Sequence, residues 1–167
     1  MRLLVLASFA GVLGACAVST DHVENADEIR INYGNGGLVI DTANHYHDLY
    51  KTGKRVVIDG PVYSADAFFA FGTPGACYTE NAVFAPHAAS YLSLIPDYEL
   101  TAAMAERLPD PLRDYFMNHH GFYDWLGFVA VPFRKLIEIW PEGACPEELT
   151  VAVSGPGTHE DAMLRRE

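Results

Sequence analysis

Apolar and polar positions follow two distinct periods in the first part of this chain. Glu28–Tyr33 alternates polar and apolar residues, which predicts a strand, and Arg55–Asp59 is a short β-branched run typical of a buried strand. Between them, Leu38–Lys51 has apolar residues at spacings of four, three and four, which predicts an amphipathic helix. Those apolar positions are Val39, Ala43, Tyr46 and Tyr50. A strand, a helix and a strand in this order favour a parallel pair joined by a right-handed crossover.

Helical patterns dominate the rest of the chain. Ser64–Phe71 predicts an apolar helix that ends at Thr73-Pro74-Gly75. Two short apolar runs, Ala76–Tyr78 and Val83–Phe84, predict a hairpin that turns at Glu80-Asn81. Further helices are expected over Tyr98–Arg107, Pro109–Asn118, Gly121–Phe128 and Pro132–Trp140. The predicted fold is therefore α/β, a single domain with a small, mostly parallel sheet and flanking helices.

The first residues have the pattern of an export signal. Arg2 precedes an uncharged apolar run, Leu3–Leu13, that is too short to span a membrane and ends in small residues. Leu13-Gly14-Ala15-Cys16 fits a bacterial lipobox, which predicts a signal peptide over residues 1–15 and a lipidated Cys16. The protein would then lie in the periplasm, anchored to an envelope membrane by lipid. Ala15-Cys16-Ala17 also fits an ordinary cleavage site, which would give a secreted protein instead.

Residues 16–27 are polar and lack periodicity, so they are predicted to form a tether. The α/β domain is predicted over residues 28–153, and residues 154–167 are expected to be a flexible tail. With 167 residues, the chain fits one domain with a full core.

The net charge of the chain and the spacing of its possible metal-binding residues limit the molecules and ions that it is expected to bind. The formal net charge of −11 repels nucleic acid and anionic lipid headgroups. The pairs His45/His47 and His119/His120 point apart on a helix, so neither chelates a metal, and no metal or other cofactor is predicted. Lipidation of Cys16 would leave Cys77 and Cys145, either as a bridge closing a loop of 69 residues or as two buried thiols.

Two strand-to-helix turns carry the candidate chemistry. Ser64 opens a helix shortly after a strand and the Gly60-Pro61 turn, and His87 follows 23 residues later. A serine hydroxyl needs a base to become a nucleophile, and imidazole suits that role at neutral pH. The amide of Ala65, at the positive end of the helix dipole, and those of Gly36 and Gly37 are candidate oxyanion donors. The structural alternative is a helix-capping Ser64, a simple glycine turn and a core histidine.

These residues carry a resemblance to a known superfamily. Gly36-Gly37, the Gly60–Ala65 segment and Phe84–Ala89 resemble the Clp-protease/crotonase-like superfamily, and within it small exported bacterial proteins related to the proteolytic subunit of Clp protease. The similarity continues into Leu108–Cys145 and so covers roughly Glu28 to Cys145. It implies a spiral α/β fold, Ser64 as nucleophile, His87 as base and a Cys77–Cys145 bridge. Related Clp subunits form rings, so the resemblance admits a homo-oligomer.

The chain departs from the family at two positions beside the serine. The family's two cysteines there are Val62 and Asp66 in this chain. A carboxylate two residues after Ser64 is expected to raise the pKa of His87 or to weaken oxyanion binding. The candidate third catalytic residue is Asp124, and Asp97 and Asp114 are its rivals.

Three functions follow from this pattern. The first is an exported, membrane-tethered serine hydrolase, a peptidase acting on a peptide or acyl substrate. The second is a non-catalytic envelope lipoprotein that keeps the fold as a binding or structural module. The third is a crotonase-like acyl-thioester enzyme, which the lack of basic clusters for a nucleotide disfavours.

Overall fold

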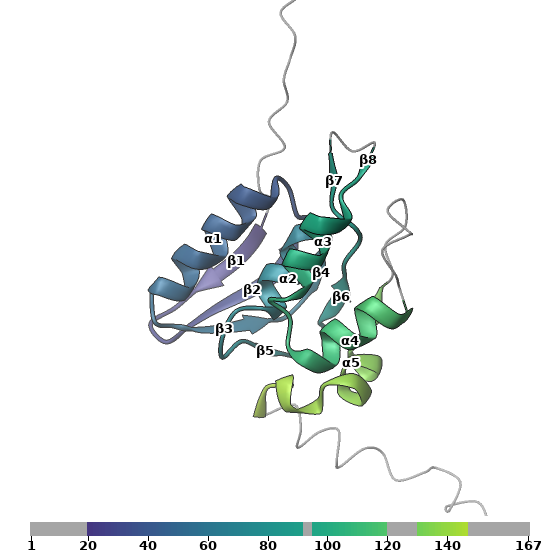
Figure 1. Cartoon of the computed structure of the whole chain (residues 1–167). Helices are drawn as coiled ribbons and strands as arrows, with labels where there is room; N and C mark the ends of the chain where they lie inside the picture. The colour runs from purple at the N-terminus through teal and green to yellow at the C-terminus, as the bar shows by residue number, and fades with distance from the viewer. Residues whose placement is uncertain (1–19, 92–94, 120–129, 147–167) are drawn as a thin grey trace, which may run out of the picture.

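The computed structural model describes residues 20–91, 95–119 and 130–146 (Figure 1). Several sequence-based expectations lie outside these ranges, namely the signal peptide, lipidated Cys16, the helix over 121–128 with Asp124, and the tail over 154–167. No helix within the described ranges is both long and apolar enough to cross a membrane.

The described residues form a sheet with helices packed on it. The strands are β1 (Thr20–Glu24), β2 (Glu28–Gly34), β3 (Arg55–Ile58), β4 (Pro61–Tyr63), β5 (Cys77–Tyr78), β6 (Val83–Ala85), β7 (Ser90–Tyr91), β8 (Ile95–Pro96) and β9 (Val131–Pro132). The helices are α1 (Val39–Lys51), α2 (Ser64–Phe71), α3 (Tyr98–Ala105), α4 (Asp110–His119), α5 (Phe133–Ile139) and the 3₁₀ turn η1 (Pro141–Gly143). The prediction of an α/β fold with a mostly parallel sheet is confirmed.

The main sheet is built from long strands that are each interrupted once. β1 runs antiparallel along one edge of β2, so β3 and β4, which both pair with β2 in parallel, lie along its other edge. β3 and β4 are two halves of one strand that contains one extra residue, a β-bulge. Opposite them, β2 advances three residues from Ile31 to Gly34, whereas β3 and β4 together advance four, from Ile58 to Val62. Gly60 sits at this interruption, where any Cβ would overlap the carbonyl oxygen of Asn32.

The next strand along the sheet repeats this arrangement. β5 pairs in parallel with β3, and β6 pairs in parallel with β4. The two interruptions are joined through Asp59, whose carboxylate accepts hydrogen bonds from the Thr79 hydroxyl, from Asn81 Nδ2 at 3.0 Å and from Arg30 Nη1 at 2.9 Å. Burial alone would raise the pKa of Asp59, but these three hydrogen bonds together lower it.

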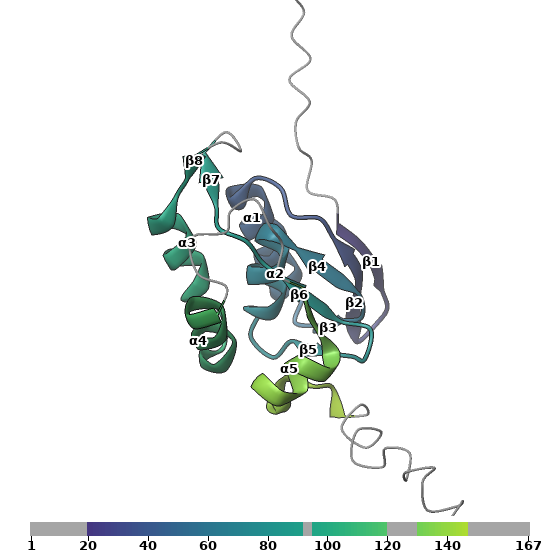
Figure 2. The same cartoon turned by 90° about the vertical axis from the view of Figure 1, so that its right-hand side faces the viewer.

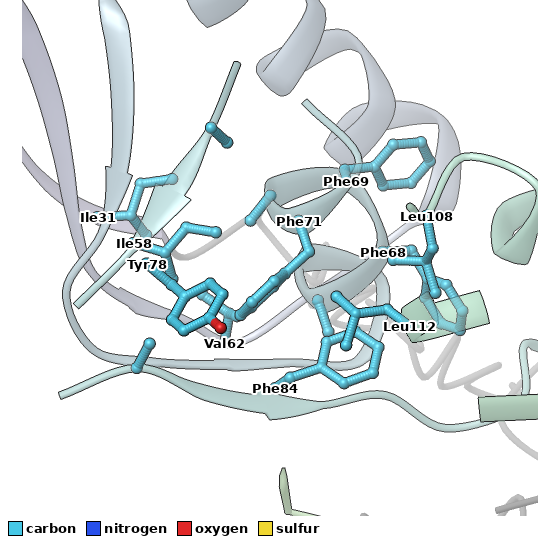
Figure 3. Close-up of a cluster of buried hydrophobic side chains, with 14 of the residues drawn as sticks. Ile31, Ile58, Val62, Phe68, Phe69, Phe71, Tyr78, Phe84, Leu108 and Leu112 are labelled. Carbon is cyan, nitrogen blue, oxygen red and sulfur yellow. The ribbon is translucent and has the colours of Figure 1, made fainter. Parts of the chain in front are cut away.

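Helices α1 and α2 pack against each other on the sheet, and α3 packs on α2. Figure 2 shows α2 between the strands and the pair formed by α3 and α4. The core lies between these layers and is rich in aromatic side chains (Figure 3). The ring centroids of Phe68 and Phe116 are 5.2 Å apart in an edge-on arrangement, and those of Phe71 and Phe84 are 5.0 Å apart. The apolar pattern of the Ser64–Phe71 segment is therefore explained by burial of this helix on several sides.

The end of the described chain is attached to the sheet covalently. Cys77 in β5 and Cys145 form a disulfide with a Cα–Cα distance of 4.9 Å. Ala144 pairs with Tyr78, and Cys145 N donates to the Tyr78 carbonyl at 2.9 Å. The expected bridge is thus confirmed, and it ties the segment after α5 to the central strands.

Three local predictions were wrong. The runs assigned to a hairpin form β5 and β6, which point the same way and pair in parallel with β3 and β4, because the turn at Glu80-Asn81 does not reverse the chain. The expected tether contains β1, since residues 20–24 are ordered by backbone pairing with β2, which needs no apolar periodicity. On α1 the buried side chains are Thr42, Tyr46 and Leu49, while Tyr50 is 51% exposed.

Candidate active site

Three loops of the chain leave the sheet at one edge. The parallel strands β2, β4 and β6 are in register there, with Gly34 opposite Val62 and Tyr63 opposite Ala85. The glycine turn follows β2, Ser64 follows β4, and Pro86-His87 follows β6. Carboxyl ends of neighbouring parallel strands are the usual place for a site in such sheets. The topology therefore brings the candidate nucleophile, base and glycine turn to a common edge.

Ser64 has an unusual backbone conformation. Its φ is +55°, and no other non-glycine residue in the described ranges has a positive φ. A residue with a side chain is strained in this left-handed region of backbone conformation. Residues with such strain are found most often at active sites and binding sites, where the surrounding structure keeps them in that conformation. Tyr63, not Ser64, is the N-cap of α2, and no side-chain capping bond is present. A capping role for Ser64 is therefore excluded.

The glycine turn packs directly on Ser64. Gly36 has a φ of +77°, and a Cβ there would lie 2.6 Å from Ser64 Cβ, 3.0 Å from its Oγ and 3.2 Å from Ala65 N. Only glycine allows this approach. The backbone amides of the turn and of the start of α2 thus lie next to the serine hydroxyl.

The carboxylate of Asp66 is hydrogen-bonded to the backbone of this glycine turn. Its side chain is fully buried, Gly36 N–H donates to its Oδ2 at 2.6 Å, and the Thr20 hydroxyl donates to its Oδ1 at 3.3 Å. Gly36 N–H is thereby engaged by an internal acceptor. Of the three oxyanion donors in the hypothesis, this leaves Gly37 and Ala65, whose N–H groups have no acceptor within the described chain.

Burial sets the protonation of the polar groups around this turn. It raises the pKa of Asp66, against the lowering effects of hydrogen bonds from Gly36 and the neighbouring hydroxyls. It also raises the pKa of Tyr46 well above its usual value, and the negative charge of Asp66 adds to this effect. The Tyr46 hydroxyl faces Asp66 without a well-formed hydrogen bond to any described residue.

His87 is partly buried beside β6. Burial lowers its pKa below 6.5, and a hydrogen bond with the backbone of Ala88 partly opposes this shift. The imidazole is therefore neutral at pH 7, which is the form that accepts a proton. Ser64 follows β4 and His87 follows β6, which pairs with β4 in parallel.

The candidate acids lie elsewhere or outside the described ranges. Asp97 accepts a hydrogen bond from Leu100 N at 2.9 Å as the N-cap of α3. Asp114 is on α4, 3.8 Å from Arg113 Nε. These two carboxylates thus interact with residues of their own helices, and Asp124 lies outside the described ranges. The described ranges also contain no group of three histidine, cysteine or acidic residues placed to hold a metal ion.

Sequence reasoning missed the partners of Asp66. Thr20 was assigned to a tether and Tyr46 to a purely apolar core. One signal did point to them. An aspartate inside the run Ala65–Phe71 must be buried, and a buried carboxylate requires polar partners from other segments.

Comparison of the chain with known proteins finds no relative. No protein-family model, no curated protein sequence and no solved structure matches the chain.

Proposed function

We propose that this chain is an exported serine hydrolase, a peptidase of the Clp-protease/crotonase-like kind, tethered to the envelope by a lipid on Cys16. The observation that carries the proposal is the strained Ser64 at the end of β4, packed against a glycine turn. The interrupted parallel strands, each followed by a helix or a loop at the same edge, support the spiral architecture of that superfamily.

The proposed reaction is acyl transfer to Ser64 and then to water. Ser64 Oγ attacks the acyl carbonyl carbon while neutral His87 takes the hydroxyl proton. The N–H groups of Ala65 and Gly37 stabilise the oxyanion that forms. His87 then gives its proton to the leaving amine or alcohol, and water, deprotonated by His87, releases the acid and restores Ser64. Asp124 would orient the imidazole.

A fluorophosphonate probe tests this proposal. The wild-type protein is expected to react covalently, whereas the Ser64→Ala variant is expected to show no labelling. Ser90→Ala, which alters a serine in β7, is the matched control and should label like the wild type. Equal labelling of wild type and Ser64→Ala, or no labelling of either, would contradict the proposal.

A non-catalytic binding module is the second candidate function. One observation favours it: the Gly36 N–H group already donates to Asp66 and is not free for an oxyanion. Leu38 and Ile40, directly after the glycine turn, are 59% and 73% exposed and could bind an apolar partner. For this function, Ser64→Ala should leave the cellular phenotype intact, whereas Leu38→Ser with Ile40→Ser should abolish it.

A further inference from the structure

A pocket separate from the Ser64 edge lies between the two central helices. It has a volume of about 230 Å³ and opens between α1, the end of α2 and the turn after α3. Ser64 is the first residue of α2, whereas the pocket lies around the last turn of that helix. Its lining residues are Ala43, Tyr46, His47, Tyr50, Phe69, Gly72, Thr73, Pro74 and Arg107.

The charge of this pocket is opposite to that of the chain. The protein has a net charge of −11, yet the lining contains Arg107 and His47 and no acidic residue. Within the described ranges, Arg107 forms no ion pair, whereas Arg30, Arg55 and Arg113 all do. A guanidinium beside a pocket without a carboxylate partner is suited to an anionic ligand.

The position of Arg107 is fixed by the fold. Its guanidinium carbon lies 5.2 Å from the centroid of the Phe69 ring, a cation–π stack. Its backbone lies against Gly72, where a Cβ would come 2.8 Å from the Arg107 carbonyl oxygen and 3.1 Å from its Cβ. A glycine at the end of α2 therefore lets this turn approach and directs the arginine over the aromatic wall.

We propose that the pocket binds a small carboxylate attached to one planar apolar group. Arg107 would pair with the carboxylate through its planar fork of N–H donors, and the rings of Tyr46, Tyr50 and Phe69 would contact the apolar part. The volume is below the roughly 300–1,000 Å³ that drug-sized ligands occupy, so a single ring is the size that fits. Both an aromatic acid and the C-terminal aromatic residue of a peptide have this chemistry.

Titration followed by amide NMR tests the proposal with the full chain in its native, disulfide-bonded form. Phenylacetate should shift the amides of the pocket residues, and 2-phenylethanol, which lacks the charge, should bind at least about tenfold more weakly. N-acetylphenylalanine represents a peptide C-terminus. Tighter binding than phenylacetate would identify peptides as the source of the ligand, and weaker binding would identify free acids.

Two arginine variants provide the matched comparison. Arg107→Gln keeps the backbone and Cβ contacts with Gly72 and should weaken phenylacetate binding at least about tenfold, while thermal unfolding stays cooperative and shifts only slightly from loss of the stack on Phe69. Arg113→Gln, on α4 and paired with Glu106 and Asp110, should bind like the wild type. Equal binding of phenylacetate and 2-phenylethanol, or full binding by Arg107→Gln, would overturn the proposal. Ser64→Ala should bind phenylacetate normally, so this result is independent of the proposed hydrolase.

Discussion

Replacing the buried carboxylate of Asp66 separates its charge from its hydrogen bonding. Asp66→Asn keeps the size of the side chain and an oxygen that accepts from Gly36 N–H, but it removes the charge. Asp66→Ala removes both and leaves Gly36 N–H without its acceptor. We expect the two variants to differ sharply in their free energies of unfolding.

The magnitudes follow from the contacts of the carboxylate. Burying an ionised carboxylate costs several kcal/mol, and a hydrogen bond to a charged group contributes about 1.5–3 kcal/mol. Asp66 has a bond from Gly36 at 2.6 Å and one from Thr20 at 3.3 Å, and its raised pKa shows that burial outweighs them. At pH 7, Asp66→Asn should therefore be as stable as the wild type or up to about 1 kcal/mol more stable, while Asp66→Ala should lose about 2–4 kcal/mol.

The comparison with Asp66→Asn should also depend on pH. Because folding raises the pKa of Asp66 above its unfolded value, the folded protein binds that proton more tightly. The stability gained from protonation is fully present below pH 3.8 and is lost as pH rises through the folded pKa. The wild type should gain stability relative to Asp66→Asn on acidification, by about 1.4 kcal/mol for each tenfold increase in proton affinity.

Urea unfolding of each protein between pH 7.5 and pH 4 measures these differences. Asp41→Asn is the matched control, since Asp41 is an exposed acid in the first turn of α1, and its change should stay within about 1 kcal/mol at every pH. An equal loss of stability in Asp66→Asn and Asp66→Ala at pH 7 would contradict these expectations, and so would a wild type that loses stability relative to Asp66→Asn as the pH falls.

Three further predictions concern the turn, the bridge and the base. Gly36→Ala should lose at least about 2 kcal/mol of unfolding free energy, because it adds a contact with Ser64 to the strain of a positive φ. Gly53→Ala, with a φ of +72° and nothing within 4 Å of its added Cβ, should lose only about 1–2 kcal/mol in the same urea assay, and an equal loss would count against the contact. Replacing Cys77 and Cys145 by serine should cost about 4 kcal/mol by the chain-entropy estimate, and dithiothreitol should destabilise the wild type but not this variant. The rate of fluorophosphonate labelling should rise with pH through an apparent pKa below 6.5, since burial of His87 favours its neutral form, and a rate that rises only above pH 8 would exclude His87 as the base.

The regular part of the fold could be predicted from the sequence. The period-two and period-3.6 patterns gave β2, α1 and β3 in parallel order, and Ser64–Phe71 has the predicted bounds of α2. These elements bury one face or several, so their apolar spacing reports their conformation. The parallel alignment of β4 and β6, which completes the common edge, comes from the structure and not from the sequence.

Other features depend on partners that local sequence does not specify. β5 has two residues and β6 has three, too few to show their direction, which is set by pairing with β3 and β4. β1 forms a strand because its backbone pairs with β2. The buried carboxylate of Asp66 accepts hydrogen bonds from Thr20 and Gly36, which lie 46 and 30 residues away along the chain. Such contacts are properties of the assembled fold.

Peptide mapping by mass spectrometry after reaction with a fluorophosphonate identifies the nucleophile directly. We predict a single phosphonyl adduct, located on Ser64, in the folded wild-type protein. An adduct confined to another serine, or an unmodified Ser64 after prolonged exposure of the folded protein, would contradict the assignment of this strained turn as a catalytic site.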